Sequence, residues 1–221
     1  MPPEAYMMEA GGLCKSCLPF VIRCRKEITA DFCALRSHMA NVVTVGGTRY
    51  LVDVGYGADG PCYPLSLQSG NIRAGLPGQQ LKLERKRLPQ HTDPGQTVWV
   101  YSHRREPGNW QEIYHFPDVE IFPEDFEVLN HYAITKSLWS QVVVAQRFVL
   151  SEDVDLGDSK KPSGTLTLVR DQLKSQLGQK KELVRSIGTE VERIATLEKD
   201  FGISLTRDEC RAIKGFMSEL K

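Results

Sequence analysis

His38 and Asp53, a base and an acid, stand on either side of a short glycine turn in this sequence. The Gly46-Gly47 pair separates two β-branched runs, and such a pair can adopt the positive φ angles of a type I′ hairpin turn. A two-residue loop pairs Val45 with Thr48 and so sets the register of the whole hairpin. In that register His38 and Asp53 lie diagonally across the two strands on the same face, within about 8 Å between their Cβ atoms.

An imidazole beside a carboxylate can act in nucleophilic catalysis. The carboxylate fixes the orientation and tautomer of the ring, and the ring takes the proton of the nucleophile. A cysteine beside the ring becomes a thiolate that can attack an activated carbonyl, so the pair predicts acyl-transfer chemistry. The alternative is a surface ion pair, and the mostly apolar residues around both positions count against it.

The cysteines offer several nucleophiles and one competing interpretation. The sequence has six, at Cys14, Cys17, Cys24, Cys33, Cys62 and Cys210. The first four lie within twenty residues of each other, and the alternative to a catalytic thiol is a zinc module built on them. Zinc sites usually have two closely spaced ligand pairs, and here only the first two cysteines form one. We therefore expect free thiols and no metal.

A glycine-rich stretch follows Asp53 directly. Gly55, Gly57 and Gly60 match the dinucleotide pattern G-x-G-x-x-G, but that pattern needs a helix to begin at the third glycine. Pro61 and Pro64 would interrupt such a helix, so we reject the match. A glycine turn whose backbone amides approach an anionic or phosphate-bearing ligand is one alternative, and a plain tight turn between strands is the other.

Composition excludes several classes of protein. The chain has 221 residues, with 28 basic and 28 acidic side chains, so no net charge attracts nucleic acid or an anionic membrane surface. No apolar run approaches the roughly 18 residues that span a bilayer. The N-terminal residues do not resemble a secretory signal, so we expect a cytoplasmic, reducing environment.

The elements that must position the pair come mainly from short strands. Beyond the hairpin of residues 37–45 and 48–54, we expect a loop over 55–80 and further strands at 79–84, 97–103, 110–116, 142–150 and 164–169. The turn-rich stretch between Phe116 and Val142 is not expected to form a regular element. We predict three parts: residues 1–36, a β-rich domain over 37–150 and a C-terminal part over 151–221.

Two helices are predicted at the end of the chain, because Thr189 and Thr206 each have a glutamate three residues later, which forms a capping box. Gly202 stands where the first helix should end. We expect each helix to bury one apolar stripe: Val191, Ile194, Ala195, Leu197 and Phe201 in the first, and Cys210, Ile213, Phe216, Met217 and Leu220 in the second. Strands first and helices last predict the α+β class.

Several segments are similar to those of one enzyme family. They are SHMANVV, TRYLVDVGYGADGP, NWQEIYHF, PEDFEVLNHY, QRF at 146–148, VERIATLEKDFGISL and AIKGFMSEL. Their order and the spacing between His38 and Asp53 resemble the arylamine N-acetyltransferases, especially the fungal type, over residues 32–221. The resemblance implies a papain- or transglutaminase-like Cys-His-Asp triad on a β-barrel with a C-terminal α/β lid. It also implies ping-pong transfer of an acetyl or malonyl group from acyl-CoA, a co-substrate, through a cysteine thioester to an arylamine or hydrazine.

The resemblance assigns roles to particular residues. His38 would be the general base and Asp53 its orienting carboxylate, while Gly55, Gly57 and Gly60 would line the cleft and contact the acyl group or CoA. The partners would be these small molecules, with no nucleic acid and no membrane, and the oligomeric state stays open.

The nucleophile depends on how the start of the chain is aligned. Ala10-Gly11-Gly12-Leu13-Cys14 resembles the family's Arg-Gly-Gly-X-Cys, so Cys14 would be the nucleophile on what remains of an N-terminal segment that lacks the family's first helices. A rival alignment sets Tyr6-Met7-Met8-Glu9 against the family's Tyr-Cys-X-Glu. A thioether cannot form an attacking thiolate, so Met7 at that position predicts a catalytically inert relative or a binding protein.

Overall fold

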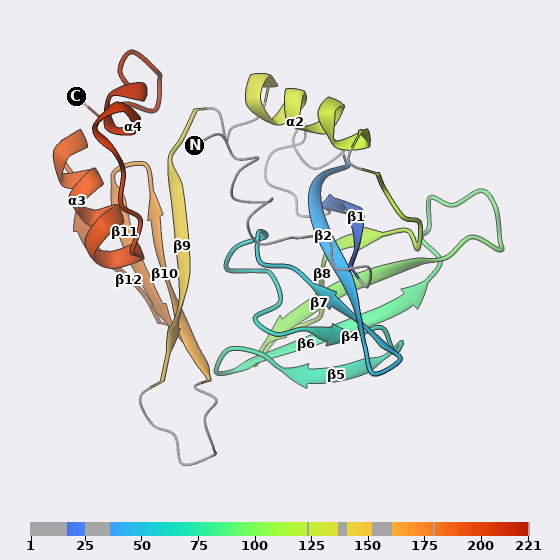
Figure 1. The fold of residues 1–221 in the computed structure, drawn as a ribbon. Coiled ribbons are helices and arrows are strands. Elements are labelled where there is room, and N and C mark those ends of the chain that lie inside the picture. Colours follow the sequence, from blue (N-terminus) through green and yellow to red (C-terminus); the bar gives the residue numbers. More distant parts are fainter. Residues whose placement is uncertain are drawn as a thin grey trace. The chain divides into compact units, whose positions relative to one another are not determined.

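The computed structural model describes residues 17–24, 36–122, 124–136, 141–151, 161–178 and 180–220 (Figure 1). The described residues up to His131 form one compact unit, and those from Tyr132 onward form a second. Each unit is built on its own sheet, and two of the described helices follow the last strand. The predicted α+β class is therefore confirmed.

An antiparallel sheet of eight strands forms the first unit, in the order β4-β3-β2-β1-β8-β7-β6-β5. Its strands are β1 (Cys17–Cys24), β2 (Arg36–Val45), β3 (Thr48–Val52), β4 (Leu65–Ser66), β5 (Asn71–Ala74), β6 (Gln79–Lys86), β7 (Val98–Arg105) and β8 (Gln111–Phe116). The predicted barrel is not confirmed, because no ladder joins β4 to β5 among the described residues. A barrel needs a closed ladder, and this sheet is open between those two edges.

The hairpin of β2 and β3 has the predicted register. Val45 pairs with Thr48, and the ladder continues regularly to the pair of Asn41 and Val52. Gly46 and Gly47 have φ angles of 57° and 78°, which a type I′ turn requires and which side chains with a Cβ rarely adopt. The second strand ends at Val52, two residues earlier than predicted, so Asp53 lies just beyond the ladder.

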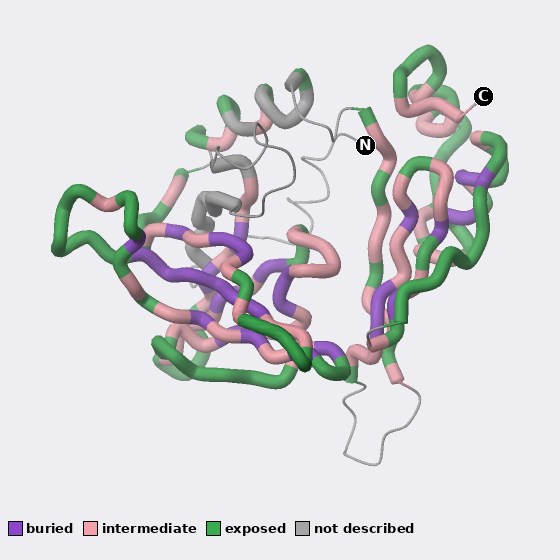
Figure 2. Tube along the Cα trace, turned by 180° about the vertical axis from the view of Figure 1, so that it is seen from behind, coloured by how far each residue is buried: buried purple, intermediate pink, exposed green. Residues whose placement is uncertain are grey.

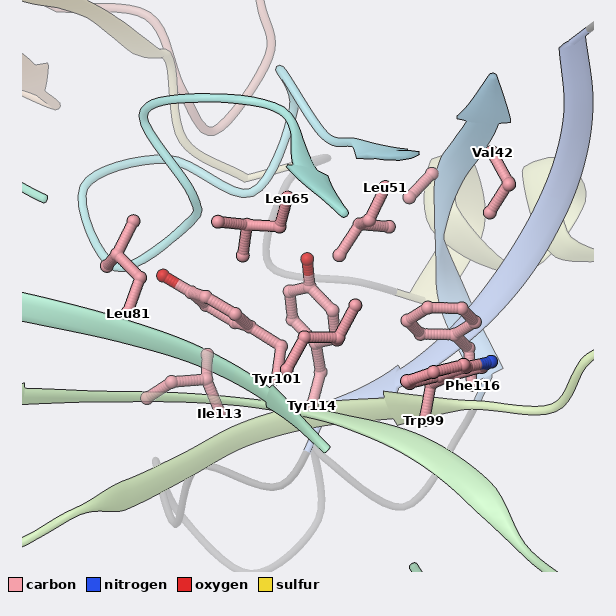
Figure 3. Close-up of a cluster of buried hydrophobic side chains, with 11 residues drawn as sticks. Val42, Leu51, Leu65, Leu81, Trp99, Tyr101, Ile113, Tyr114 and Phe116 are labelled. Carbon is pink, nitrogen blue, oxygen red and sulfur yellow. The ribbon is translucent and has the colours of Figure 1, made fainter. Parts of the chain in front are cut away.

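The core of the first unit is aromatic. Tyr101, Tyr114 and Phe116 are fully buried on β7 and β8, and the centroids of the two tyrosine rings lie 4.9 Å apart. Figure 3 shows both tyrosines side by side with Leu51 and Leu65 of the hairpin side of the sheet. The hairpin therefore packs on an aromatic layer, and in Figure 2 most of the buried stretches of the first unit lie along its strands.

Several elements of the first unit were not predicted. β1 lies between the hairpin and β8, and it was missed because the sequence before residue 37 has only weak periodicity. The predicted loop over 55–80 contains β4 and β5. The helix α2 (Asp125–Lys136) occupies the segment where no regular element was expected. Asp125 begins it, and its Oδ2 accepts a hydrogen bond of 3.0 Å from the backbone N–H of Phe122.

The second unit has a four-stranded antiparallel sheet in the order β12-β11-β10-β9. Its strands are β9 (Val144–Leu150), β10 (Pro162–Val169), β11 (Gln172–Leu177) and β12 (Lys180–Ser186). The first two match the predicted strands. The other two were missed because they are mostly polar, and every residue of β12 is exposed. β12 is an edge strand, where charged side chains are common.

Both predicted helix starts are confirmed. The helix α3 (Glu190–Phe201) begins at Thr189, whose side chain accepts from the backbone N–H of Glu192, and ends at Gly202 with φ 69°. The helix α4 (Arg207–Ala212) begins at Thr206 with a complete capping box. These outcomes follow from residues within one helical turn of each cap.

The predicted apolar stripes are wrong in part. α3 buries Leu197 as expected, but also Arg193 and Thr196, while Val191 is 76% exposed. The buried face of α3 therefore overlaps only in part with the predicted apolar face. α4 buries none of its residues and includes only Cys210 of the predicted stripe, and Phe216 and Met217 beyond it are exposed.

Among the described residues, no helix combines the length and the apolar character that crossing a lipid bilayer requires.

Candidate active site

His38 and Asp53 are in contact, as the hairpin register predicted. The ring Nε2 of His38 lies 2.9 Å from Oδ1 and 3.0 Å from Oδ2 of Asp53. The carboxylate is completely buried, whereas 18% of the imidazole side chain is exposed. A buried carboxylate therefore supports a ring whose other edge can be reached from outside the core.

The backbone after β3 holds the carboxylate in place. The Asp53 Oδ1 also accepts hydrogen bonds of 3.1 Å from the backbone N–H groups of Gly55 and Tyr56. This is the turn that an aspartate forms with its own following backbone, and here it turns the chain away from the sheet. With these donors and the imidazole satisfied, the buried carboxylate has the partners that its burial requires.

The contact also assigns the two nitrogens of the histidine. Because Nε2 faces the carboxylate, the tautomer that donates Nε2–H to Asp53 leaves the lone pair on Nδ1. Nδ1 is then the atom that can accept a proton from a nucleophile or an incoming amine. This assignment follows from the hydrogen-bond geometry rather than from observed hydrogens.

Two tyrosines restrict the histidine ring, and residue spacing did not predict either of them. The Tyr56 ring meets the His38 ring edge to face, with centroids 5.2 Å apart, and the Tyr114 ring lies 6.3 Å away. Burial is the first reason that the pKa of Tyr114 lies well above its usual value, and the nearby charge of Asp53 raises it further. The phenol therefore stays protonated beside the site. Tyr114 lies in the NWQEIYHF segment. That segment supports the family resemblance, but it did not predict that Tyr114 lies near His38.

The glycine loop packs directly against the histidine. A Cβ on Gly55 would lie 3.3 Å from Cε1 of His38, closer than most Cβ atoms approach a neighbour. Gly60 closes a turn by donating to the carbonyl of Gly57 at 2.9 Å. The residues between Asp53 and Leu65 form no helix, so the rejection of the dinucleotide pattern is confirmed. The contact of Gly55, Gly57 and Gly60 with an acyl group or CoA stays a prediction.

Both positions proposed for the nucleophile lie outside the described part of the chain. The structure describes neither Cys14 nor Met7, so the choice between them stays a prediction. Among the described cysteines, Cys62 is free and packs against the core near Tyr56. Burial raises the pKa of its thiol, which is the opposite of what an activated nucleophile needs.

The four-cysteine zinc module does not fit the strand β1. Cys17 and Cys24 are its two ends. Seven steps of extended chain span about 23 Å, whereas two thiolates on one zinc ion lie within about 4 Å of each other, so these two cysteines cannot share an ion. Cys14 and Cys33 lie outside the described residues, and no group of three metal-binding side chains is found among the described ones.

The first unit thus has a hairpin that presents a histidine and a buried aspartate above an aromatic core. A model of the N-acetyltransferase family matches residues 23–210. The chain belongs to the arylamine N-acetyltransferase family.

Individual relatives agree with that family. The N-malonyltransferase FDB2 of Gibberella moniliformis is 27% identical over 183 residues, which cover 78% of this chain and 52% of the relative. The chain thus spans about half the length of the curated relatives that it matches. The arylamine N-acetyltransferase of Mycobacterium abscessus has a similar fold, with a TM-score of 0.67, 22% identity, and coverage of 88% of this chain and 63% of that one. The Mycobacterium marinum enzyme in complex with CoA has a TM-score of 0.64, 21% identity, and coverage of 89% and 67%.

Proposed function

We propose that this protein transfers an acyl group from acyl-CoA to an amine through a cysteine thioester. The observation that carries the proposal is the contact of 2.9 Å between His38 Nε2 and the buried Asp53 carboxylate, which leaves Nδ1 as a base. Family membership supports the acyl-transfer class, and the N-malonyltransferase relatives support a malonyl donor beside the acetyl donor.

The first half-reaction loads the enzyme. His38 Nδ1 takes the thiol proton of the nucleophile, for which we propose Cys14, and forms a thiolate and an imidazolium. The thiolate attacks the thioester carbonyl of acyl-CoA, the acyl group moves to the cysteine sulfur, and CoA leaves with the proton of the imidazolium. Asp53 keeps the ring in place and stabilises its positive charge during both transfers.

In the second half-reaction the acyl group moves from the enzyme to the amine. An arylamine or hydrazine attacks the cysteine thioester, and His38 Nδ1 accepts the proton that the amine nitrogen loses as the amide forms. The cysteine leaves as a thiolate, which then takes that proton back from the imidazolium. We propose that the loop of Gly55, Gly57 and Gly60 borders the space for the acyl group, because it packs on the ring of His38.

Mass spectrometry of the intact protein tests the proposal directly. Incubation with acetyl-CoA or malonyl-CoA should add one acyl group, and an arylamine should remove it. The adduct should be absent in Cys14→Ser and His38→Ala and present in His91→Ala, a matched control in an exposed loop. If neither donor leaves an adduct on the wild-type protein, the proposal fails, and the inert relative predicted by the Met7 alignment takes its place.

A further inference from the structure

A cavity of about 230 Å³ lies at the opening of the first sheet, away from the histidine and aspartate. Its walls come from both edge strands, through Ser66 of β4 and Asn71 of β5, and from Tyr50 of β3. Leu65 and Leu83 are buried beneath it. Because no ladder closes the sheet between β4 and β5, side chains rather than backbone groups fill this gap, and Asn71 Nδ2 donates to Ser66 Oγ across it at 3.4 Å.

The charge of the cavity has one sign. Among the described residues that line the cavity, Arg73 is the only ionised side chain, and the other polar groups are neutral hydroxyls and amides. Within the described ranges, no carboxylate lies at ion-pair distance from Arg73. A cationic cavity without a counter-charge favours an anion over a neutral or cationic ligand.

Arg73 is also held in position before any ligand binds. Its Nη1 donates to the carbonyl of Pro64 at 3.1 Å, and its guanidinium carbon lies 4.6 Å from the centroid of the Tyr63 ring. A guanidinium has five N–H donors, so most of them remain for an oxyanion, which it can bind in a bidentate manner. Preorganisation of this kind lowers the entropy that binding costs.

We propose that this cavity binds a small organic oxyanion, with Arg73 as the charged ligand and Gln68, Asn71, Ser66 and Tyr50 as neutral hydrogen-bonding groups. A volume of about 230 Å³ is smaller than the usual pocket for a drug-sized ligand, so it suits a short-chain carboxylate or a small phosphate and not a whole CoA.

The site is separate from the candidate active site. Tyr50 precedes Asp53 by three residues of extended chain, which is about 10 Å. A ligand that links β4 to β5 would add a connection at the opening of the sheet, whose strand β2 carries His38. Binding therefore does not depend on acyl transfer, and it should persist in His38→Ala.

Isothermal titration calorimetry on the full chain, with malonate and inorganic phosphate as separate probes, tests the proposal. At constant ionic strength we expect saturable binding of at least one probe. Binding of malonate alone identifies a carboxylate site, binding of phosphate alone identifies a phosphate site, and mutual competition identifies one site for both. Malonamide, the uncharged analogue of malonate, should not bind.

The variants separate the site from general salt effects, because phosphate also stabilises proteins without binding to a site. Arg73→Gln should weaken binding at least tenfold, Gln68→Ala by a smaller factor, and Arg87→Gln, an exposed arginine outside the cavity, should bind as the wild type does. Circular dichroism checks that each variant folds. If Arg73→Gln does not fold, the result for Gln68→Ala still tests the proposal. Equal binding by all three variants, binding of malonamide, or no binding of either probe would overturn the proposal.

Discussion

The side-chain carboxylate of Asp53 has no exposed surface, and its hydrogen-bond partners lie on the neighbouring strand and in the turn that follows β3. Its Oδ1 accepts from His38 and from two backbone N–H groups of the following turn. The same atom therefore orients the imidazole and shapes the chain that leaves the hairpin. Replacements of this residue should separate the two roles.

Asp53→Asn should reduce acyl transfer by about 10²–10⁴-fold and change stability little. The asparagine oxygen can still accept from Gly55 and Tyr56, but its amide would donate to Nε2 and place the proton of the ring on Nδ1, where the base is needed. Asp53→Ala should lose activity and also stability, because two backbone N–H groups lose their acceptor. Steady-state rates and urea unfolding measure the two effects, and full activity in Asp53→Asn would contradict the proposed role.

Cys62 should react slowly with iodoacetamide near neutral pH. Burial raises the pKa of its thiol, and a raised pKa means less thiolate at any pH below it. Peptide mass spectrometry after labelling at several pH values should show a rate that rises only in the alkaline range. The labelling rate of Cys62 is also the background rate with which the rate of an activated thiol is compared. Rapid labelling of Cys62 at neutral pH would contradict this prediction.

At the scale of elements, the β2–β3 hairpin determines where the pair meets. Its turn requires positive φ at both glycines, and the start of β3, next to the turn, is joined by an ion pair to the segment after β8. Arg49 of β3 binds Asp118, which follows β8, through two hydrogen bonds of 3.1 and 2.6 Å, and Arg85 of β6 lies 3.7 Å from the same carboxylate. The glycine turn and this ion pair should contribute independently to the free energy of unfolding.

Gly46→Val should destabilise the protein by about 1–2 kcal/mol or more, because a β-branched residue is strained at φ 57°. Gly46→Asn is the matched control, since asparagine tolerates this conformation and nothing lies within 4 Å of a Cβ at this position. Chemical denaturation gives both values. Equal stability of the two variants would mean that the turn does not have the conformation described.

Asp118→Asn should cost about 0.5–1 kcal/mol at neutral pH, a value reduced for the partial exposure of the pair. Hydrogen bonding to Arg49 is the main reason that the pKa of Asp118 lies below its usual value. A lowered pKa stabilises the folded state above the unfolded pKa, and this contribution is lost as the pH falls through the folded value. The difference between the unfolding free energies of wild type and variant, measured with urea, should therefore become smaller in acid. A difference that grows in acid would contradict this assignment.

At the scale of the whole molecule, the described chain has separate hydrophobic cores in its two units. The first is centred on β7 and β8, and the second joins Leu168, Leu173, Ile187 and Leu197. Since a core residue is stabilised by the neighbours it touches, a cavity in one core should act first on its own unit.

Leu168→Ala and Leu81→Ala test this separation, because both side chains have no exposed surface. Each should cost about 2–5 kcal/mol. In hydrogen exchange with mass spectrometry, Leu168→Ala should speed exchange in β10, β11 and α3, whereas Leu81→Ala should do so in β6, β7 and β8. Equal acceleration in both units by either variant would show one cooperative core instead of two.

Local patterns were the most predictable part of the fold. The register of the hairpin follows from two adjacent glycines, and the starts of α3 and α4 follow from a threonine and the glutamate three residues after it. The polar strands β11 and β12 and the helix α2 could not be found in this way. Their conformation depends on pairing and packing with segments that the local sequence does not specify.

The amino-acid sequence by itself determined the contact between His38 and Asp53, because turn length and strand alternation decide which side chains face each other across a two-residue turn. Only the tertiary structure decided which tyrosines surround the imidazole, which face of α3 is buried, and that the first sheet stays open with a cationic cavity at its opening. These features join residues from strands that are distant in the chain, and their energies arise from burial and shape, which no local spacing encodes.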